Sequence, residues 1–370
     1  MEKVRLGDYI EEYSVRNKND ENLPVYSVTN TQGFCRDYFG KEVASKDKTT
    51  YKIVPKGCFA YNPSRINVGS VDWQRKEERV IVSPLYNVFA VSERLRQQYL
   101  YYYLKSNFAL QRIRSVATGS VRDNLKLEML KEFPIWLPSV EEQDAIVKKL
   151  DIVNEVINFR RQEILKLENL AQARFVEMFG DENNSKNWNV VNVEDVADVQ
   201  VGVVIKPSQY YTDESEGVRA FRSLNIGAGF IKDIDWVYFT KEGHLKNSKS
   251  ILKENDLLIV RSGAPGTACV VTEEYAGCNA VDIIIAHPDC EKVNPYYLCT
   301  FTNMPHGKKQ IDEGIGGAAQ QHFNVGKYNK LQLMLPPKTL QDEFGDFINQ
   351  VDKSKLPLPL QTHTCQPNTS

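Results

Sequence analysis

The stretch SVEEQDAIVKKLDIVNEVINFRRQEILKLENLAQARFVEMFGD, residues 139–181, decides how this chain is organised, because it predicts one long helix. Ser139 and Glu142 form a capping box, in which two side chains satisfy amide hydrogens that lack a partner at a helix start. Gly180 directly follows Phe179 and is typical of a left-handed helix stop. At ~1.5 Å per residue, this helix would be roughly 57 Å long, more than one globular domain needs.

Apolar side chains recur along this helix in alternating steps of four and three, which is the pattern of a coiled-coil seam. Arg160 and Arg174 interrupt the seam, and the other faces are mostly charged or amide residues. Such a seam must be buried against a partner helix, although a core helix spanning one domain is the alternative interpretation. The apolar seam positions are Ile146, Leu150, Val153, Ile157, Ile164, Leu167, Ala171 and Met178.

The length of 370 residues, 42% of them hydrophobic and 25% charged, leaves room for two domains with a core each. No apolar run reaches the length of a membrane span, and the first residues lack a signal-peptide pattern. The seven cysteines include no Cys-x-x-Cys pair, so we expect reduced thiols, no structural metal and a cytoplasmic location without a membrane partner. Residues 1–139 hold 22 Lys and Arg against 16 Asp and Glu, which allows a local basic surface.

The second half of the sequence runs through segments like those of the first in the same order, and seven positions from 119 to 153 match at a fixed offset of 198 residues. The match has no gap and includes both loop glycines and helix residues, so it indicates two copies of one unit. Each copy is a mixed domain followed by a helix, and the second helix can therefore bury the seam of the first. The matched pairs are Gly119 and Gly317, Leu137 and Leu335, Pro138 and Pro336, Gln143 and Gln341, Ile146 and Phe344, Leu150 and Ile348, and Val153 and Val351.

We predict an α+β fold with two tandem, pseudo-symmetric domains joined by long helices that form an antiparallel coiled coil. Pro357 and Pro359 cannot continue a helix, so the second helix should be about 17 residues long, against about 40 for the first. The predicted segments are a first domain at 1–138, a central helix at 139–181, a second domain at 184–337, a short second helix at 338–355 and an irregular tail at 356–370.

Three helix stretches make this sequence resemble the specificity subunit of type I restriction-modification systems. They are LPSVEEQDAIVKKLDIVNEVI (137–157), LKLENLAQARFVEMFGD (165–181) and LPPKTLQDEFGDFINQVDKS (335–354). The resemblance covers about residues 4–355 and implies a subunit without catalysis of its own, associated with the nucleoid. Each of two target-recognition domains would read one half of an asymmetric double-stranded DNA site, while the helices set the gap between the halves.

The same resemblance implies partner subunits that carry the chemistry. Two methyltransferase subunits would dock along the helices and transfer methyl groups from S-adenosylmethionine to adenine, and restriction subunits that use ATP and Mg could join them. No cofactor is expected in this chain. The family pattern would extend the second helix and often places a helical segment before the first domain. A truncated, silent or decoy allele that acts only as an interaction protein or recombination donor therefore stays open.

Base reading requires side chains that form paired hydrogen bonds, typically Arg with guanine and Asn or Gln with adenine. Such residues fall in predicted loops at equivalent places of the two repeats, although each alone could be an ordinary solvated loop residue. Arg112, Arg114, Lys308 and Lys309 are better suited to phosphates. The candidate DNA contacts are Asn30, Thr31, Gln32, Arg65, Ser120, Arg122 and Asn124 in the first domain, and Arg222, Asn225, Arg261, Ser262, Gln320, Gln321 and His322 in the second.

A catalytic methyltransferase or nuclease is the rival interpretation, and the motifs disfavour it. Asn62-Pro63-Ser64-Arg65 starts like an amino-methyltransferase motif but lacks the second proline and the aromatic residue that stacks on a flipped base. The five histidines form no i, i+4 ligand pair. The tyrosines at 99–103 have helical spacing, which favours core packing over base stacking.

Overall fold

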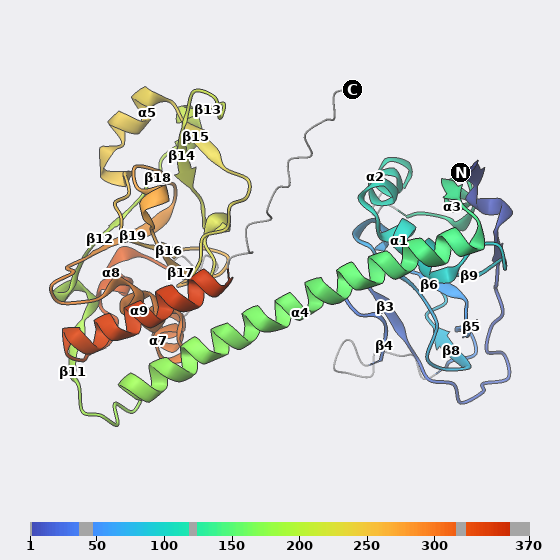
Figure 1. Ribbon diagram of the computed structural model, residues 1–370, viewed down its shortest axis with the longest axis horizontal. Coiled ribbons are helices and arrows are strands. Elements are labelled where there is room, and N and C mark those ends of the chain that lie inside the picture. The colour runs from blue at the N-terminus through green and yellow to red at the C-terminus, as the bar shows by residue number, and fades with distance from the viewer. Residues whose placement is uncertain (1, 37–46, 118–123, 316–322, 356–370) are drawn as a thin grey trace, which may run out of the picture. The chain divides into compact units, whose positions relative to one another are not determined.

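The computed structural model describes residues 2–36, 47–117, 124–315 and 323–355, and the chain forms two compact units, Met1–Phe159 (unit 1) and Arg160–Ser370 (unit 2) (Figure 1). Each unit combines mostly antiparallel sheets with helices, so the predicted α+β fold is confirmed. No helix in the described ranges is both long and apolar enough to cross a membrane.

Unit 1 combines short strands with short helices. Its helices are α1 (Gln97–Lys105), α2 (Asn107–Val116) and α3 (Leu127–Lys131). Its strands are β1 (Glu2–Arg5), β2 (Ile10–Glu12), β3 (Ser27–Thr29), β4 (Gly33–Cys35), β5 (Lys52–Pro55), β6 (Phe59–Tyr61), β7 (Val71–Trp73), β8 (Arg79–Val82), β9 (Asn87–Val91) and β10 (Pro134–Leu137).

The central sheet of unit 1 is antiparallel, with strand order β2-β9-β6-β7. Alternation along β6 gives each face of this sheet a core, because Phe59 and Tyr61 belong to one buried cluster and Ala60 to another. The Phe59 ring stacks on Phe89 of β9 with centroids 5.1 Å apart. Leu100 of α1 lies in the same cluster, so the helices cover that face.

Three of the four tyrosines of α1, Tyr99, Tyr101 and Tyr103, pack against the core of unit 1, as their spacing predicted, whereas the Tyr102 hydroxyl donates to the Asp151 carboxylate. The hydroxyl of Tyr99 donates to the carbonyl oxygen of Trp136 at 2.8 Å, and that of Tyr103 donates to Pro134 at 2.7 Å. Both acceptors lie on β10, which pairs with β1. Burial raises the pKa of Tyr103 to about 12, which keeps this hydroxyl protonated as a donor.

Unit 2 repeats this architecture. Its helices, apart from the long helix described below, are α5 (Lys241–Lys246), α6 (Pro295–Asn303), α7 (Pro305–Ile315), α8 (Val325–Asn329) and α9 (Lys338–Lys355). Its strands are β11 (Asn189–Asn192), β12 (Ala197–Val201), β13 (Tyr211–Thr212), β14 (Val218–Phe221), β15 (Val237–Phe239), β16 (Leu257–Val260), β17 (Ala268–Val270), β18 (Asn279–Ala280), β19 (Ile283–Pro288) and β20 (Gln332–Leu335).

The strand orders show the repeat directly. The order β12-β19-β16-β17 in unit 2 corresponds to β2-β9-β6-β7 in unit 1, and the ribbon β11-β20 corresponds to β1-β10. Both ribbons are antiparallel pairs of four residues, and Ile135, which pairs with Val4, corresponds at the 198-residue offset to Leu333, which pairs with Val191. The units differ where unit 2 forms the additional sheet β13-β15-β14-β18 and unit 1 has two separate strand pairs.

The long helix α4 runs from Val140 to Phe179. The predicted capping box is present, since the Glu142 amide donates to Ser139 Oγ at 3.3 Å and the Ser139 amide donates to Glu142 Oε2 at 2.9 Å. Gly180 ends the helix with φ of +89°, the left-handed conformation that glycine adopts without strain.

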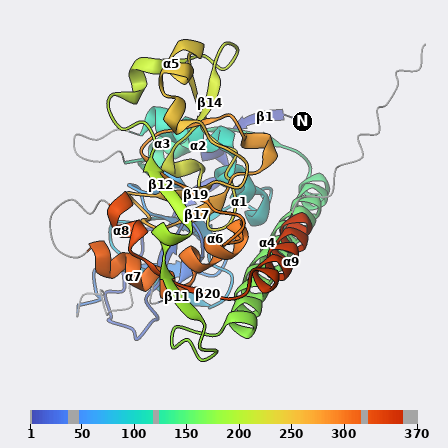
Figure 2. The ribbon, with the colours of Figure 1, turned by 90° about the vertical axis from the view of Figure 1, so that its left-hand side faces the viewer.

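Helix α9 packs antiparallel to the last twenty residues of α4, within unit 2 (Figure 2). Arg174 pairs with Glu343 at 3.4 Å, and Arg160 Nη2 donates to the carbonyl oxygen of Ser354 at 3.0 Å, so the two chains run in opposite directions. The ring of Phe344 contacts Phe175 edge-on, with centroids 5.5 Å apart. This arrangement agrees with the predicted antiparallel pair.

The predicted seam residues divide into three groups by burial. Those within or against the core of unit 2 are buried, namely Met178, Phe344, Ile348 and Val351. Ile146, Ile164, Leu167 and Ala171 are half-buried. Leu150, Val153 and Ile157, which precede the part of α4 that faces α9, are 38%, 54% and 42% exposed.

Candidate nucleic-acid interface

In unit 1, the turn of the β3-β4 hairpin presents three candidate DNA contacts. Asn30, Thr31 and Gln32 are all exposed at this turn. The Gln32 amide donates to Thr29 Oγ1 at 3.0 Å, and Gly33 closes the turn with φ of +61°. The hairpin therefore has a defined turn that displays amide and hydroxyl groups outward.

A buried carboxylate fastens this hairpin to the central sheet. Asp72 of β7 accepts a hydrogen bond from the Phe34 amide at 3.0 Å and another from the Trp73 amide at 2.8 Å. It also forms an ion pair with Arg75. A Cβ atom at Gly33 would overlap the Asp72 carboxylate, so this close approach requires glycine.

The loop between β6 and β7 lies beside the hairpin and carries Arg65. The Arg65 side chain is exposed, and no described residue forms an ion pair or side-chain hydrogen bond with it. Asn62 Oδ1 accepts hydrogen bonds from the amide and hydroxyl of Ser64, so the Asn62-Pro63-Ser64 motif serves as a turn. The two loops line a hollow formed by Ser27, Val28, Thr29, Asn30, Asn62, Arg65, Val68, Ser70 and Tyr86.

Further groups border this hollow. Asn124 is exposed, and the next residue, Leu125, donates its amide to the carbonyl oxygen of Pro63 at 3.1 Å. Arg114 Nε donates to the carbonyl oxygen of Asn67 at 3.2 Å. Asn124 and Arg114 therefore lie next to the Arg65 loop, where an amide could read a base and a guanidinium could contact a phosphate.

Unit 2 has a hollow between the equivalent pair of loops. One loop follows β14 and corresponds to the β3-β4 hairpin of unit 1. The other joins β16 to β17 and corresponds to the Arg65 loop. The Phe323 amide donates to the carbonyl oxygen of Arg261 at 3.1 Å, which repeats the bond from Leu125 to Pro63 at the 198-residue offset. The lining residues are Ser223, Leu224, Ile226, Gly227, Ala228, Phe230, Lys232, Val260, Ser262, Gly263, Ala264 and Thr267.

The structure places several unit 2 candidates inside the loops rather than on their surface. Asn225 is fully buried. Its Nδ2 donates to the carbonyl oxygens of Lys232 and Ile234, and its Oδ1 accepts from the Arg222 amide. This geometry argues against a base contact for Asn225. The Arg222 guanidinium donates to the carbonyl oxygen of Asp235 and is partly buried.

Arg261 is similarly engaged within unit 2. Its guanidinium forms an ion pair with Asp282, and its Nε donates to the carbonyl oxygen of Phe323 at 3.3 Å. The side chain is 17% exposed. Its role in this geometry is to hold the β16-β17 loop. Ser262, by contrast, lines the hollow. Ser120, Arg122, Gln320, Gln321 and His322 lie outside the described residues.

Sequence reasoning missed some residues that line the hollows. Tyr86 and Asn62 of unit 1 and Phe230 and Lys232 of unit 2 were not among the candidates. Phe230 is 46% exposed, and an exposed aromatic ring beside a lysine offers stacking and phosphate contact together. Its position in a glycine-flanked loop equivalent to the unit 1 hairpin is the signal that could have identified it.

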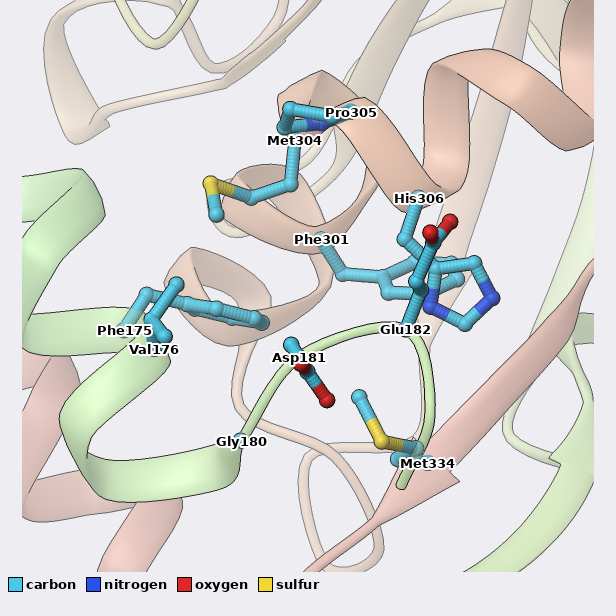
Figure 3. A pocket seen from close by; sticks show the side chains of 10 residues that line it. All are labelled: Phe175, Val176, Gly180, Asp181, Glu182, Phe301, Met304, Pro305, His306 and Met334. Atoms are coloured by element: carbon cyan, nitrogen blue, oxygen red, sulfur yellow. The ribbon is translucent and has the colours of Figure 1, made fainter. Parts of the chain in front are cut away.

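A third cavity, in unit 2, has a different chemistry (Figure 3). It is lined by apolar side chains such as Phe175, Met304 and Met334, and also by Asp181 and Glu182. Negative groups and apolar walls are unsuited to phosphate. In the described part of the chain, no cluster of His, Cys, Asp and Glu could hold a metal ion.

His306 adds one polar atom to this cavity. Its Nδ1 is buried and has no hydrogen-bond partner among the described residues, and Figure 3 shows the ring beside Glu182 and Phe301. Burial lowers the pKa of His306, with an opposing contribution from Glu182, so the neutral ring is favoured. These features set the cavity apart from the two polar loop hollows.

Comparison with known families gives two matches along this chain. The family described as "Type I restriction modification DNA specificity domain" matches residues 2–169 and again residues 185–358. The two matches coincide with the two repeats and together cover most of the sequence.

Individual relatives agree with this result. The specificity subunit of the type I restriction enzyme MjaVIII of Methanocaldococcus jannaschii is 25% identical over 382 residues, which cover 95% of this chain and 86% of that protein. The MjaIX specificity subunit of the same organism is 21% identical over 271 residues, 68% of this chain and 61% of that protein, which is less than two thirds of its length.

A solved structure supports the fold. The S subunit of a type I restriction-modification system from M. genitalium superimposes with a TM-score of 0.51 at 15% sequence identity, covering 96% of this chain and 90% of that one. At this identity the likeness concerns the fold alone.

Proposed function

Because this chain belongs to the type I restriction-modification DNA specificity family, we propose that its two units each read one half of a split DNA site. The observation that carries this proposal is the repeated hollow, which lies between equivalent loops of both units. The loops around the two hollows differ in sequence, while the central sheets, which carry one loop of each hollow, keep the same strand order. A shared scaffold with different loops is suited to reading two different half-sites.

In unit 1, we propose that base edges are read by the exposed amides of the hairpin turn and by Arg65. Arg65 can form the bidentate pair with guanine, and Asn30 or Gln32 can pair with adenine. Asn124 borders the same hollow, and Arg114 would hold a phosphate nearby. In unit 2, Ser262, Lys232 and Phe230 are the corresponding described candidates.

The chain would act through partner subunits. Two adenine methyltransferase subunits would bind the helical part of this chain and use S-adenosylmethionine, and restriction subunits using ATP and Mg would add cleavage. The exposed apolar residues of α4, such as Val153 and Ile157, offer a surface for such contacts. The assembled complex would work in the cytoplasm on nucleoid DNA, and the helical segment between the units would set the gap between the half-sites.

The proposal is tested by producing this chain together with a methyltransferase subunit in a host without DNA methylation and mapping methyladenine across the genome. The expected result is a split motif with a fixed gap. Methylation by this chain without any partner, or a continuous motif, would contradict the proposal. Stable assembly with the methyltransferase but no methylation would instead support the alternative of a silent or decoy specificity protein.

A further inference from the structure

The ammonium group of Lys105 bridges the two loops that form the unit 1 hollow. Lys105 is the last residue of α1, and its Nζ donates to the carbonyl oxygen of Asn30 at 3.0 Å and to that of Gly69 at 2.5 Å. Asn30 belongs to the hairpin turn, and Gly69 belongs to the loop that carries Arg65. A single side chain therefore bonds the backbone of both loops.

The surroundings of Lys105 favour this bridging position. Nζ lies 5.5 Å from the centroid of the Tyr101 ring, which is a cation–π distance. Gly69 adopts the left-handed conformation, with φ of +90°, and its backbone lies next to the Lys105 side chain. Burial lowers the pKa of Lys105, and the carboxylate of Asp72 opposes that shift. The lysine is thus a half-buried group engaged with the protein, unlike a solvated phosphate ligand.

The residue at the equivalent position of unit 2 holds the start of β17, where the loop from β16 ends, and is linked to the other loop through a backbone hydrogen bond. Asn303 lies 198 residues after Lys105 and ends α6 as Lys105 ends α1. Its side chain donates to the carbonyl oxygen of Ala268 at 2.9 Å and accepts from the Ala268 amide at 3.1 Å. The same carbonyl oxygen accepts a hydrogen bond from Gly229, in the loop after β14, at 2.8 Å.

We infer that Lys105 and Asn303 are positioning residues that fix the spacing of the two loops lining each hollow, and so set how strictly each unit discriminates its half-site. This inference rests on the proposed function. Base discrimination requires donors and acceptors on both loops to meet base edges at once, so the distance between the loops matters as much as their sequences. Neither residue touches DNA in this account.

The test uses the full chain with its methyltransferase subunit and measures methylation at sites that carry single-base changes in either half. Lys105→Met keeps the length of the side chain but removes both hydrogen bonds. Discrimination between the correct and the changed base should fall about tenfold in one half only. This corresponds to a loss of roughly 1.4 kcal/mol in the free-energy difference between the two sites. Asn303→Leu should cause the same loss in the other half. Lys131→Met, which removes a lysine paired only with Glu128 among the described residues, is the matched control and should change neither half.

A purely structural role predicts a different outcome. If Lys105→Met lowers the melting temperature but leaves discrimination in both halves unchanged, or reduces both equally, the inference is overturned. Should that variant lose all methylation through unfolding, Lys105→Arg decides the matter, because it keeps the charge with a different donor geometry. A change confined to one half supports the inference, and unaltered discrimination overturns it. Failure of the proposed function is distinguishable, because the unmutated chain would then give no split motif.

Discussion

Gln143 and Gln341 make the same three hydrogen bonds in the two units, although they lie 198 residues apart in the sequence. Gln143 Nε2 donates to the carbonyl oxygens of Arg94 and Pro138, and its Oε1 accepts from the Arg96 amide. Gln341 does the same with Lys292, Pro336 and Asn294. Every partner is displaced by the same 198 residues, so each helix is joined to its domain by one conserved bonding pattern.

This pattern predicts matched losses of stability. Both glutamines are fully buried, so Gln143→Leu and Gln341→Leu should each cost about 1–3 kcal/mol in the free energy of unfolding, because buried backbone groups lose their partners. Chemical denaturation measures this effect. Gln350→Leu, at an exposed position of α9, is the control and should change stability by less than about 0.5 kcal/mol. A cost for Gln143→Leu no larger than that of the control would contradict the prediction.

The close approach of Gly33 to Asp72 predicts a strong effect of one methyl group. Gly33→Ala should cost more than about 2 kcal/mol, because it combines a positive φ with overlap on the Asp72 carboxylate. Gly57→Ala has a similar φ of +88° but only an ordinary contact, so it should cost about 1 kcal/mol. Thermal unfolding of the two variants compares them, and equal losses would show that the overlap is relieved.

The pairing of α4 with α9 predicts unequal roles for two phenylalanines. Phe344 is fully buried against Phe175 and Phe179, so Phe344→Ala should cost about 3–5 kcal/mol. Phe159 is 64% exposed, and Phe159→Ala should be close to neutral for stability. Denaturation curves provide the measurement. A mild effect at Phe344 would mean that α9 is not part of the core.

Exposed and buried polar candidates should behave in opposite ways. Arg65→Ala should cost about 1–3 kcal/mol of discrimination at one base pair of one half-site, with little effect on folding. Asn225→Ala should destabilise unit 2, because three backbone groups would lose their bonds. Methylation of single-base site variants and thermal unfolding distinguish the two, and loss of discrimination with intact stability for Asn225→Ala would reverse this assignment.

The lowered pKa of His306 predicts that the stability of the fold changes with pH. Its pKa is lowered in the folded chain, so as pH falls through the ordinary value of 6.5 the unfolded chain takes up a proton first and the fold loses stability. The groups beside it act in opposite directions, since Glu182 raises and Lys309 lowers its pKa. His306→Phe should therefore lose less stability between pH 7 and the lowered pKa than the unmutated chain. Parallel unfolding curves across this range would refute the assignment.

The helices and the repeat could be predicted from sequence because their signals are local or periodic. The capping box at Ser139, the glycine at 180 and the fixed offset each depend on residue spacing alone. The extent of burial along α4 could not be predicted, because exposure at Leu150 and Val153 depends on what packs there in space.

The candidate interface could be predicted only as a set of loops. Their residue types grouped Asn225 and Arg261 with Arg65 as candidate base contacts. Inside unit 2, however, Asn225 donates to a backbone carbonyl oxygen and Arg261 forms an ion pair with Asp282. Whether a polar side chain faces solvent depends on which acceptors the fold brings near it, and these acceptors come from distant positions. Lys105 was missed for the same reason, since its two acceptors lie 36 and 75 residues away.

The claim that each unit reads one half-site is tested most directly by exchanging residues 1–138 for the first domain of a type I specificity subunit with a known half-site. The exchanged chain is produced with its methyltransferase subunit, and methyladenine is mapped across the genome. We predict that one half of the split motif becomes that of the donor, while the other half is retained. A change in both halves, or an unchanged motif, would contradict the claim that each unit reads one half-site independently.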